Sequence, residues 1–166
     1  MDEVPKTESF YEAYLTIFRL REAGYSLRSR QRAFEALVMF DERFDWWPIV
    51  GITTAAWESI QRNISAGKTP YQATKGLNRS HMMSRTDRAK EMFERESPMG
   101  SDEAFDFYYA NDRTVLATSS ENMAEVWSEV TDIPVEIFSN RTGMGPRLTK
   151  ARYEALTEIL DSDFSK

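Results

Sequence analysis

Cysteine is absent from this chain of 166 residues. Its absence excludes a cysteine nucleophile, cysteine-ligated zinc and iron–sulfur clusters. It also favours a reducing compartment, because secreted domains of this size often carry disulfides. No apolar run approaches the roughly 20 residues that a membrane helix needs, and the N-terminus lacks the basic start and apolar core of a signal peptide. We therefore expect a soluble, cytoplasmic protein with no membrane partner.

Histidine is almost as scarce, with His81 as its single occurrence, so any imidazole chemistry at neutral pH must use that residue. Apolar residues are plentiful by contrast, at 41% of the chain, and aromatic residues make up 13%. That material is sufficient for a packed core and is not typical of a disordered protein. The length suits one domain, so we predict a single domain over residues 1–166.

Charge is unevenly distributed along the chain, whose formal net charge is −6. The window 62–90 is basic, and Asp87 is its one acidic residue. Such a window forms either a phosphate-binding face or a solvated surface neutralised by the acidic C-terminal third. The basic residues of the window are Arg62, Lys68, Lys75, Arg79, Arg85, Arg88 and Lys90.

The hydrophobic pattern predicts helices over residues 1–98 and a mixed arrangement over residues 99–166. Apolar residues recur at helical spacing in the first part, between residues that favour helix caps. The predicted helices cover residues 8–23, 26–44, 54–66, 85–96, 101–110 and 149–160, and a short helix or turn is predicted from Pro70 to near Gly76. In the second part, residues 114–118 read as a buried strand and residues 133–138 as an edge strand.

Between these strands, the pattern predicts a helix capped by Ser119 or Ser120 that buries Met123, Val126, Trp127 and Val130. The expected fold class is α+β, mostly α, with an N-terminal helical part followed by a small element of two or three strands and helices.

One phosphate-binding motif is rejected. The residues Gly67-Lys68-Thr69 match the end of a phosphate-binding loop, but that loop needs a glycine where Arg62 stands, and a strand where a helix is predicted.

The segment around His81 carries a more specific pattern. Basic residues flank the histidine, a capped helix follows it, and the strand 114–118 leads into a helix start that contains Asn122. This arrangement resembles the ββα-metal nucleases (HNH, or His-Me finger, nucleases) over about residues 76–125. In that family a histidine on one strand activates water, and an Asn or His at the start of the following helix holds a divalent cation.

The resemblance implies a metal-dependent nucleic-acid phosphodiesterase with His81 as general base. It implies Asn122 as a metal-binding residue, Mg²⁺ or Mn²⁺ as the cation, and DNA or RNA as substrate. A carboxylate would complete the metal site, and the alternatives are Asp112, Glu121 and Glu125. The residues implied as phosphate contacts are Arg79, Arg85 and Arg88.

Two other functions fit the same sequence. A non-catalytic binding or regulatory protein, acting through a protein partner, fits the acidic C-terminal third and the lack of a dense catalytic cluster. A helical nucleic-acid-binding module would use the helix 26–44. The adjacent pair Trp46-Trp47 is interpreted either as a plug between diverging helices or as a stacking platform.

Overall fold

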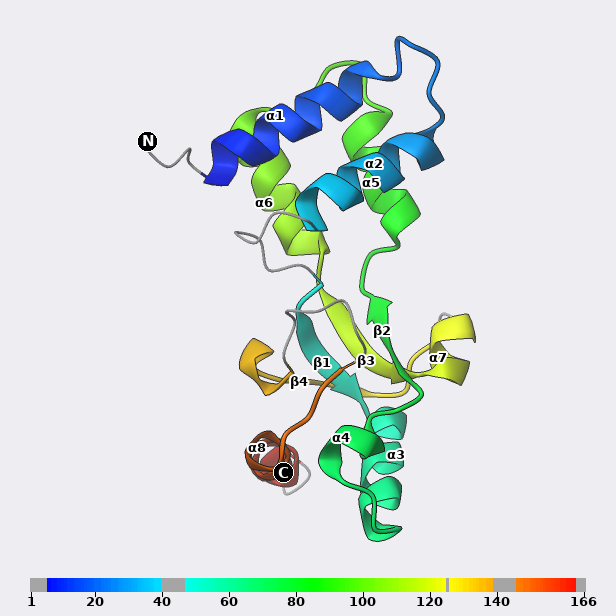
Figure 1. The fold of residues 1–166 in the computed structure, drawn as a ribbon, viewed down its shortest axis with the longest axis vertical. Helices are drawn as coiled ribbons and strands as arrows, with labels where there is room; N and C mark the ends of the chain where they lie inside the picture. The colour runs from blue at the N-terminus through cyan, green and yellow to red at the C-terminus, as the bar shows by residue number, and fades with distance from the viewer. Residues whose placement is uncertain (1–5, 40–46, 125, 139–145, 164–166) are drawn as a thin grey trace. The chain divides into compact units, whose positions relative to one another are not determined.

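The computed structural model describes residues 6–39, 47–124, 126–138 and 146–163. The chain forms two compact units, and each unit is built from two stretches of sequence (Figure 1). Unit 1 comprises residues 1–46 and 82–112, and unit 2 comprises residues 47–81 and 113–166. The fold is α+β and mostly helical, and helices precede the first strand, which confirms the predicted fold class. The predicted boundary at residue 98 does not coincide with this division, because part of the sheet lies before it.

The regular secondary structure of unit 1 is helical in its described residues, and turns and loops join the helices. Its helices are α1 (Lys6–Arg19), α2 (Leu27–Met39), α5 (Arg85–Phe93) and α6 (Ser101–Asn111). Their apolar faces meet in an aromatic core, where the rings of Phe10, Phe34 and Tyr108 lie 5.3 to 5.4 Å apart. Offset and edge-to-face contacts of this kind stabilise a core beyond the burial of apolar area.

Two buried polar side chains hold the end of α5 within unit 1. The Tyr14 hydroxyl donates to the Met92 carbonyl at 3.0 Å and accepts from the Met99 amide at 2.9 Å. The Arg30 guanidinium donates to the Phe93 carbonyl at 2.7 Å and is only 4% exposed. These bonds satisfy carbonyls that the end of a helix leaves without intrahelical partners.

Unit 2 contains a four-stranded sheet with the order β2-β3-β1-β4. Its strands are β1 (Ile49–Thr53), β2 (Leu77–His81), β3 (Thr114–Thr118) and β4 (Val130–Asp132). The central pair β1 and β3 is parallel, while β2 pairs antiparallel with β3 and β4 antiparallel with β1. The remaining elements are α3 (Thr54–Ser65), α4 (Pro70–Ala73), α7 (Ser119–Ala124), the 3₁₀ turn η1 (Val135–Ile137) and α8 (Lys150–Asp163).

The core of unit 2 joins one face of the sheet to α3 and α8. Ile52 and Leu116 lie opposite each other on the central strands, and both belong to this core together with Ile60 of α3 and Leu156 of α8. Across the described residues, no helix is long and apolar enough to span a membrane.

The sequence did not predict β1 or β2. β2 carries a single apolar residue, Leu77, so it has no alternating pattern by which a strand is recognised. β1 contains Gly51, which normally weakens a strand. Here the glycine is required, because a Cβ at residue 51 would lie 2.9 Å from Cγ1 of Val130 on β4.

The region after β3 also differs from its prediction. The helix α7 ends at Ala124, and Met123 and Val126 are 79% and 69% exposed instead of buried. Residues 133–138, predicted as a strand, contain the 3₁₀ turn η1 instead, while β4 lies just before them. The Ile133 amide still donates to the Val50 carbonyl at 2.9 Å, but Pro134 has no amide hydrogen and the pairing stops there.

Candidate nucleic-acid interface

The strand that carries His81 is β2, at one edge of the sheet. Arg79 lies opposite Leu116 on β3, and His81 lies opposite Thr114. Because side chains alternate along a strand, Arg79 and His81 share a face with Leu77, and both leucines belong to the core of unit 2. The predicted general base and one predicted phosphate contact are therefore neighbours on the core face of the sheet.

The guanidinium of Arg79 is the least satisfied group of this face. Its Nε and Nη2 atoms are buried and have no hydrogen-bond partner within the described parts of the chain. Burial lowers the pKa of Arg79 below its ordinary value, since a charged group loses hydration there. Nε and Nη2 are on one edge of the guanidinium, the edge that binds two oxygens of a phosphate or carboxylate at once.

His81 packs against Trp47, which the sequence assigned either to a structural plug or to a stacking platform. The two rings meet edge to face, with centroids 4.9 Å apart and an interplanar angle of 86°. The Trp47 backbone has a φ of 52°, in the left-handed region that a bulky residue rarely adopts. Thr114 holds it in place, because its hydroxyl lies 3.2 Å from the Trp47 carbonyl and 3.0 Å from the Pro48 carbonyl. Trp46 lies outside the described residues.

Asn122 lies at the other end of the same strand pair. His81 is opposite Thr114, at the start of β3, whereas Asn122 is in α7, which follows the end of β3. At about 3.3 Å per residue, the length of β3 separates the two ends by roughly 13 Å. A contact at that far end joins the Asn78 amide to the Ser119 hydroxyl at 2.8 Å. The structure therefore does not bring His81 and Asn122 together.

The carboxylates considered for a metal site have other contacts. Glu121 accepts hydrogen bonds from the hydroxyls of Thr53, Thr118 and Ser128 and from the amides of Thr118 and Ser128, at 2.6 to 2.9 Å. Burial alone would raise the pKa of Glu121, but these bonds outweigh it and lower the pKa to about 2. Asp112 is fully buried in unit 1, and Glu125 lies outside the described residues. Among the residues that the structure describes, no three metal-ligating side chains form a cluster.

Arg88 is a buried ion-pair partner rather than a surface phosphate contact, which corrects the prediction made for it. Only 2% of its side chain is exposed. Its Nη1 donates to the Asp112 carboxylate at 2.5 Å, and its Nη2 lies 3.7 Å from the Glu35 carboxylate. The guanidinium carbon also lies 4.5 Å from the centroid of the Tyr108 ring. A guanidinium held by two carboxylates and an aromatic ring has no exposed edge for a phosphate.

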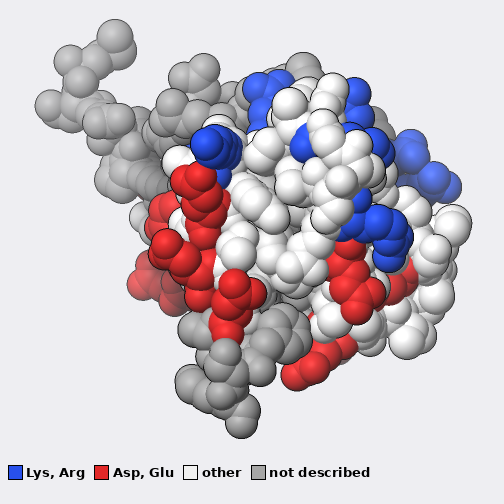
Figure 2. Space-filling view, turned by 90° about the horizontal axis from the view of Figure 1, so that it is seen from below, with Lys and Arg blue, Asp and Glu red and all other residues white. Residues whose placement is uncertain are grey.

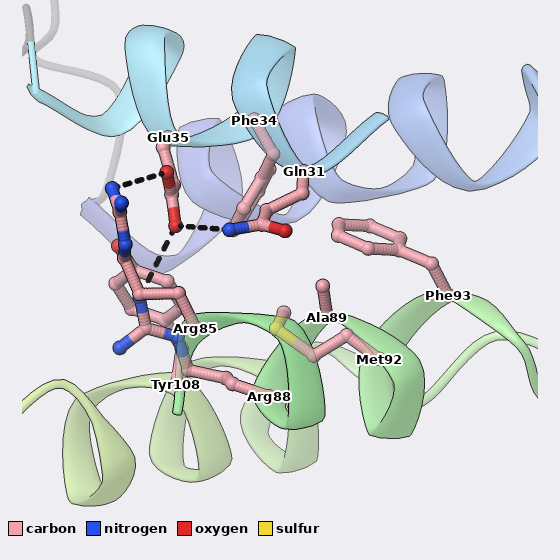
Figure 3. A pocket seen from close by; sticks show the side chains of 9 residues that line it. All are labelled: Gln31, Phe34, Glu35, Arg85, Arg88, Ala89, Met92, Phe93 and Tyr108. Atoms are coloured by element: carbon pink, nitrogen blue, oxygen red, sulfur yellow. Dashed lines mark hydrogen bonds and ion pairs between the residues drawn. The ribbon is translucent and has the colours of Figure 1, made fainter. Parts of the chain in front are cut away.

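Arg85 is attached to the same cluster in unit 1. Its Nη1 lies 3.2 Å from the Glu35 carboxylate, and 45% of its side chain is exposed. Figure 3 shows Glu35 between α2 and α5, with its carboxylate directed at Arg85 and Arg88. The predicted phosphate contacts are thus divided, because Arg85 and Arg88 belong to unit 1 and Arg79 belongs to unit 2.

Unit 2 has an exposed basic corner next to β2. Arg62 on the last turn of α3, Lys68 in the following loop and Lys75 after α4 are all exposed. The Lys68 ammonium donates to the side-chain oxygen of Asn63 at 2.7 Å. A capping box between Thr69 and Gln72 fixes the start of α4. The sequence places no acidic residue between positions 62 and 81.

Acidic residues gather elsewhere on unit 2. The helix α8 exposes Glu154, Glu158 and Asp161, whose spacing places them on one face of the helix. Seen from below in Figure 2, basic side chains occupy the upper part and the right of the view, whereas acidic side chains line its left and also lie below the basic ones on the right. The net negative charge of the chain therefore coexists with a local basic surface.

Sequence reasoning identified Arg79 but missed what distinguishes it from Arg85 and Arg88. All three are basic residues near His81, and their different burial arises from packing between distant segments. It also missed the contact between Trp47 and His81, because nothing in the sequence signals the left-handed backbone of Trp47.

No protein-family model, no curated protein and no solved structure matches this chain.

Proposed function

We propose that unit 2 binds nucleic acid through a basic surface formed by Arg62, Lys68, Lys75 and Arg79. The observation that carries the proposal is the segment 62–81, which exposes cations on the α3–α4 corner, holds Arg79 on β2, and contains no acidic residue. Lysine and arginine side chains bind the phosphate backbone by releasing its condensed counterions. Binding of this kind uses no cofactor.

Binding without cleavage is the form of this function that the geometry favours. Metal-dependent hydrolysis needs the base and the cation at one phosphate. His81 and Asn122 lie at opposite ends of the β2–β3 pair, so the arrangement implied by the nuclease resemblance is not formed by these two residues. The experiments must therefore also be able to detect nuclease activity with Mg²⁺ or Mn²⁺.

The test is the salt dependence of binding, measured by fluorescence anisotropy with labelled single-stranded and duplex oligonucleotides. If each of the basic residues contacts one phosphate, the logarithm of the association constant falls with the logarithm of salt concentration at a slope of about −3 to −4. The double variant Lys68→Gln/Lys75→Gln should weaken binding at low salt and make the slope less steep by about 1.5 to 2.

A matched control is available on the acidic side of unit 2. Lys150 is 85% exposed on α8, 3.9 Å from Glu154, and Lys150→Gln removes a charge far from the proposed contacts in sequence. This variant should retain the affinity and the slope of the unmodified protein. Equal losses in both variants would show a non-specific charge effect, and binding insensitive to salt would exclude phosphate contacts by this surface.

A further inference from the structure

Arg79, which is half-buried, differs from the buried Arg30 and Arg88 in how its charge is accommodated. Arg30 donates to the Phe93 carbonyl and Arg88 is paired with the Asp112 carboxylate, although Nε of Arg30 and Nη2 of Arg88 have no hydrogen-bond partner of their own among the described residues. Arg79 has two buried donors, Nε and Nη2, that bond to no described residue. Buried donors without partners are costly, and a partner from outside the chain removes that cost.

The strands β1, β2 and β3 supply no counter-ion to Arg79. The adjacent strand β3 has the sequence TVLAT, and β1 beyond it has IVGIT, so neither carries an acidic side chain. On β2 itself, the neighbours on the same face are Leu77 and His81. Burial removes water from the Arg79 guanidinium, and these strands provide no anion in its place. The positive charge is therefore not neutralised by them, and the pKa of Arg79 is lowered.

The geometry of the two donors defines the missing partner. Two parallel N–H groups on one edge of a guanidinium match two oxygens of the same phosphate or carboxylate. Both donors lie below the protein surface, so the oxyanion must project into the protein to reach them. An internal phosphodiester carries a sugar on each side and offers two free oxygens, whereas a terminal phosphate has one ester link and three free oxygens.

We infer that Arg79 binds the terminal phosphate of a nucleic-acid strand, held by Nε and Nη2, while the exposed lysines contact the phosphates that follow. The inference rests on the proposed nucleic-acid binding and names the part of the ligand that is recognised. A terminal phosphate monoester also carries a charge of about −1.5 to −2 at neutral pH, which opposes the desolvated guanidinium better than a phosphodiester does. Lys75, which ends the α4 turn just before β2, is the nearest exposed cation in the sequence.

The experiment compares one short single-stranded oligonucleotide in three forms, with a 5′-phosphate, with a 3′-phosphate and with hydroxyls at both ends. Binding is measured for the unmodified protein and for Arg79→Lys, which keeps the charge but removes the two-donor edge. Arg19→Lys, an equivalent change at an exposed position of α1 in unit 1, outside the proposed binding surface, is the matched control. At least one phosphorylated form should bind the unmodified protein about tenfold more tightly than the hydroxyl form. Arg79→Lys should abolish that ratio, and Arg19→Lys should preserve it.

Inorganic phosphate provides a second readout that does not depend on the oligonucleotide. It should raise the melting temperature of the unmodified protein and of Arg19→Lys in a concentration-dependent way, but not that of Arg79→Lys. If Arg79→Lys fails to fold, the ratio between phosphorylated and hydroxyl forms in the unmodified protein decides the matter alone.

The outcomes separate the two proposals. Equal affinity for all three forms, with loss of affinity in Lys68→Gln/Lys75→Gln, would overturn the terminal-phosphate site and leave nucleic-acid binding intact. Stabilisation by inorganic phosphate that needs Arg79, without binding of any oligonucleotide, would overturn both the nucleic-acid source of the phosphate and the proposed function.

Discussion

Arg88 and Asp112 form an ion pair inside unit 1 in which the arginine is 2% exposed and the aspartate 0%. The pair connects α5 to the end of α6, because Arg88 also donates to the Asn111 carbonyl at 3.2 Å. Removing one member of a buried pair leaves the other charge desolvated and unpaired.

The first prediction concerns this pair. Asp112→Asn should lower the free energy of unfolding by about 3 kcal/mol, because the more distant Glu35 would be the one carboxylate left beside Arg88 among its described contacts. Urea denaturation measures the change. Lys90→Gln is the control, since Lys90 and Asp87 form a pair that is more than half exposed, and its loss should cost less than about 0.5 kcal/mol. A small and equal effect of both variants would mean that the buried pair contributes nothing to stability.

The second prediction concerns pH and Glu121. Its pKa is about 2 in the folded protein, below an ordinary value of 4.5. Because the folded pKa is the lower one, this carboxylate stabilises the protein above about pH 5, and its contribution disappears as the pH falls toward 2. Glu121→Gln should therefore cost about 1 to 3 kcal/mol at neutral pH, allowing for partial solvent screening.

The measurement is the difference in unfolding free energy between the two proteins across that pH range. The difference should shrink steadily below about pH 5 and vanish near pH 2. Glu158→Gln, a change on the exposed face of α8, should show no such trend. A difference that stays constant with pH would show that the hydrogen bonds of Glu121 do not depend on its charge.

The third prediction tests the close approach of β1 and β4. Gly51→Ala should destabilise the protein by about 1 to 3 kcal/mol, because the new Cβ would lie 2.9 Å from Cγ1 of Val130. The double variant Gly51→Ala/Val130→Ala should lose less than the sum of the two single losses, since the second change removes the clashing methyl group. If the loss of stability in the double variant equals the sum of the two single losses, in thermal or urea unfolding, then β1 and β4 can move apart without a loss of stability.

The fourth prediction concerns metal removal. Binding of nucleic acid by the basic surface should be unchanged by EDTA, because it uses lysine and arginine side chains alone. Supercoiled plasmid should remain intact with Mg²⁺ or Mn²⁺, both for the unmodified protein and for His81→Ala. Metal-dependent nicking that disappears in His81→Ala would instead restore the nuclease function and require a cation site that does not depend on proximity to Asn122.

Local sequence signals predicted the elements that local interactions determine. The predicted capped helix after His81 is α5, and Ser84 caps it by accepting from the Asp87 amide at 3.1 Å. Thr69 caps α4 in the same way. The buried strand 114–118 matches β3 residue for residue. In each of these, residues within a few positions of one another carry the information.

Tertiary structure alone decided what depends on distant segments. β2 is a strand because β3 pairs with it, and the chain between them is a helical part of the other unit. Arg79 and Arg88 are both arginines close to His81 in the sequence. Arg88 pairs with a carboxylate, whereas Arg79 meets none among the described residues, because the strands beside Arg79 carry no acidic side chain. The sequence by itself determined a helical, cysteine-free chain with a basic segment near its one histidine. Which of those cations is buried, paired or available was determined by packing, since burial and pairing are properties of the assembled neighbours and not of the residue.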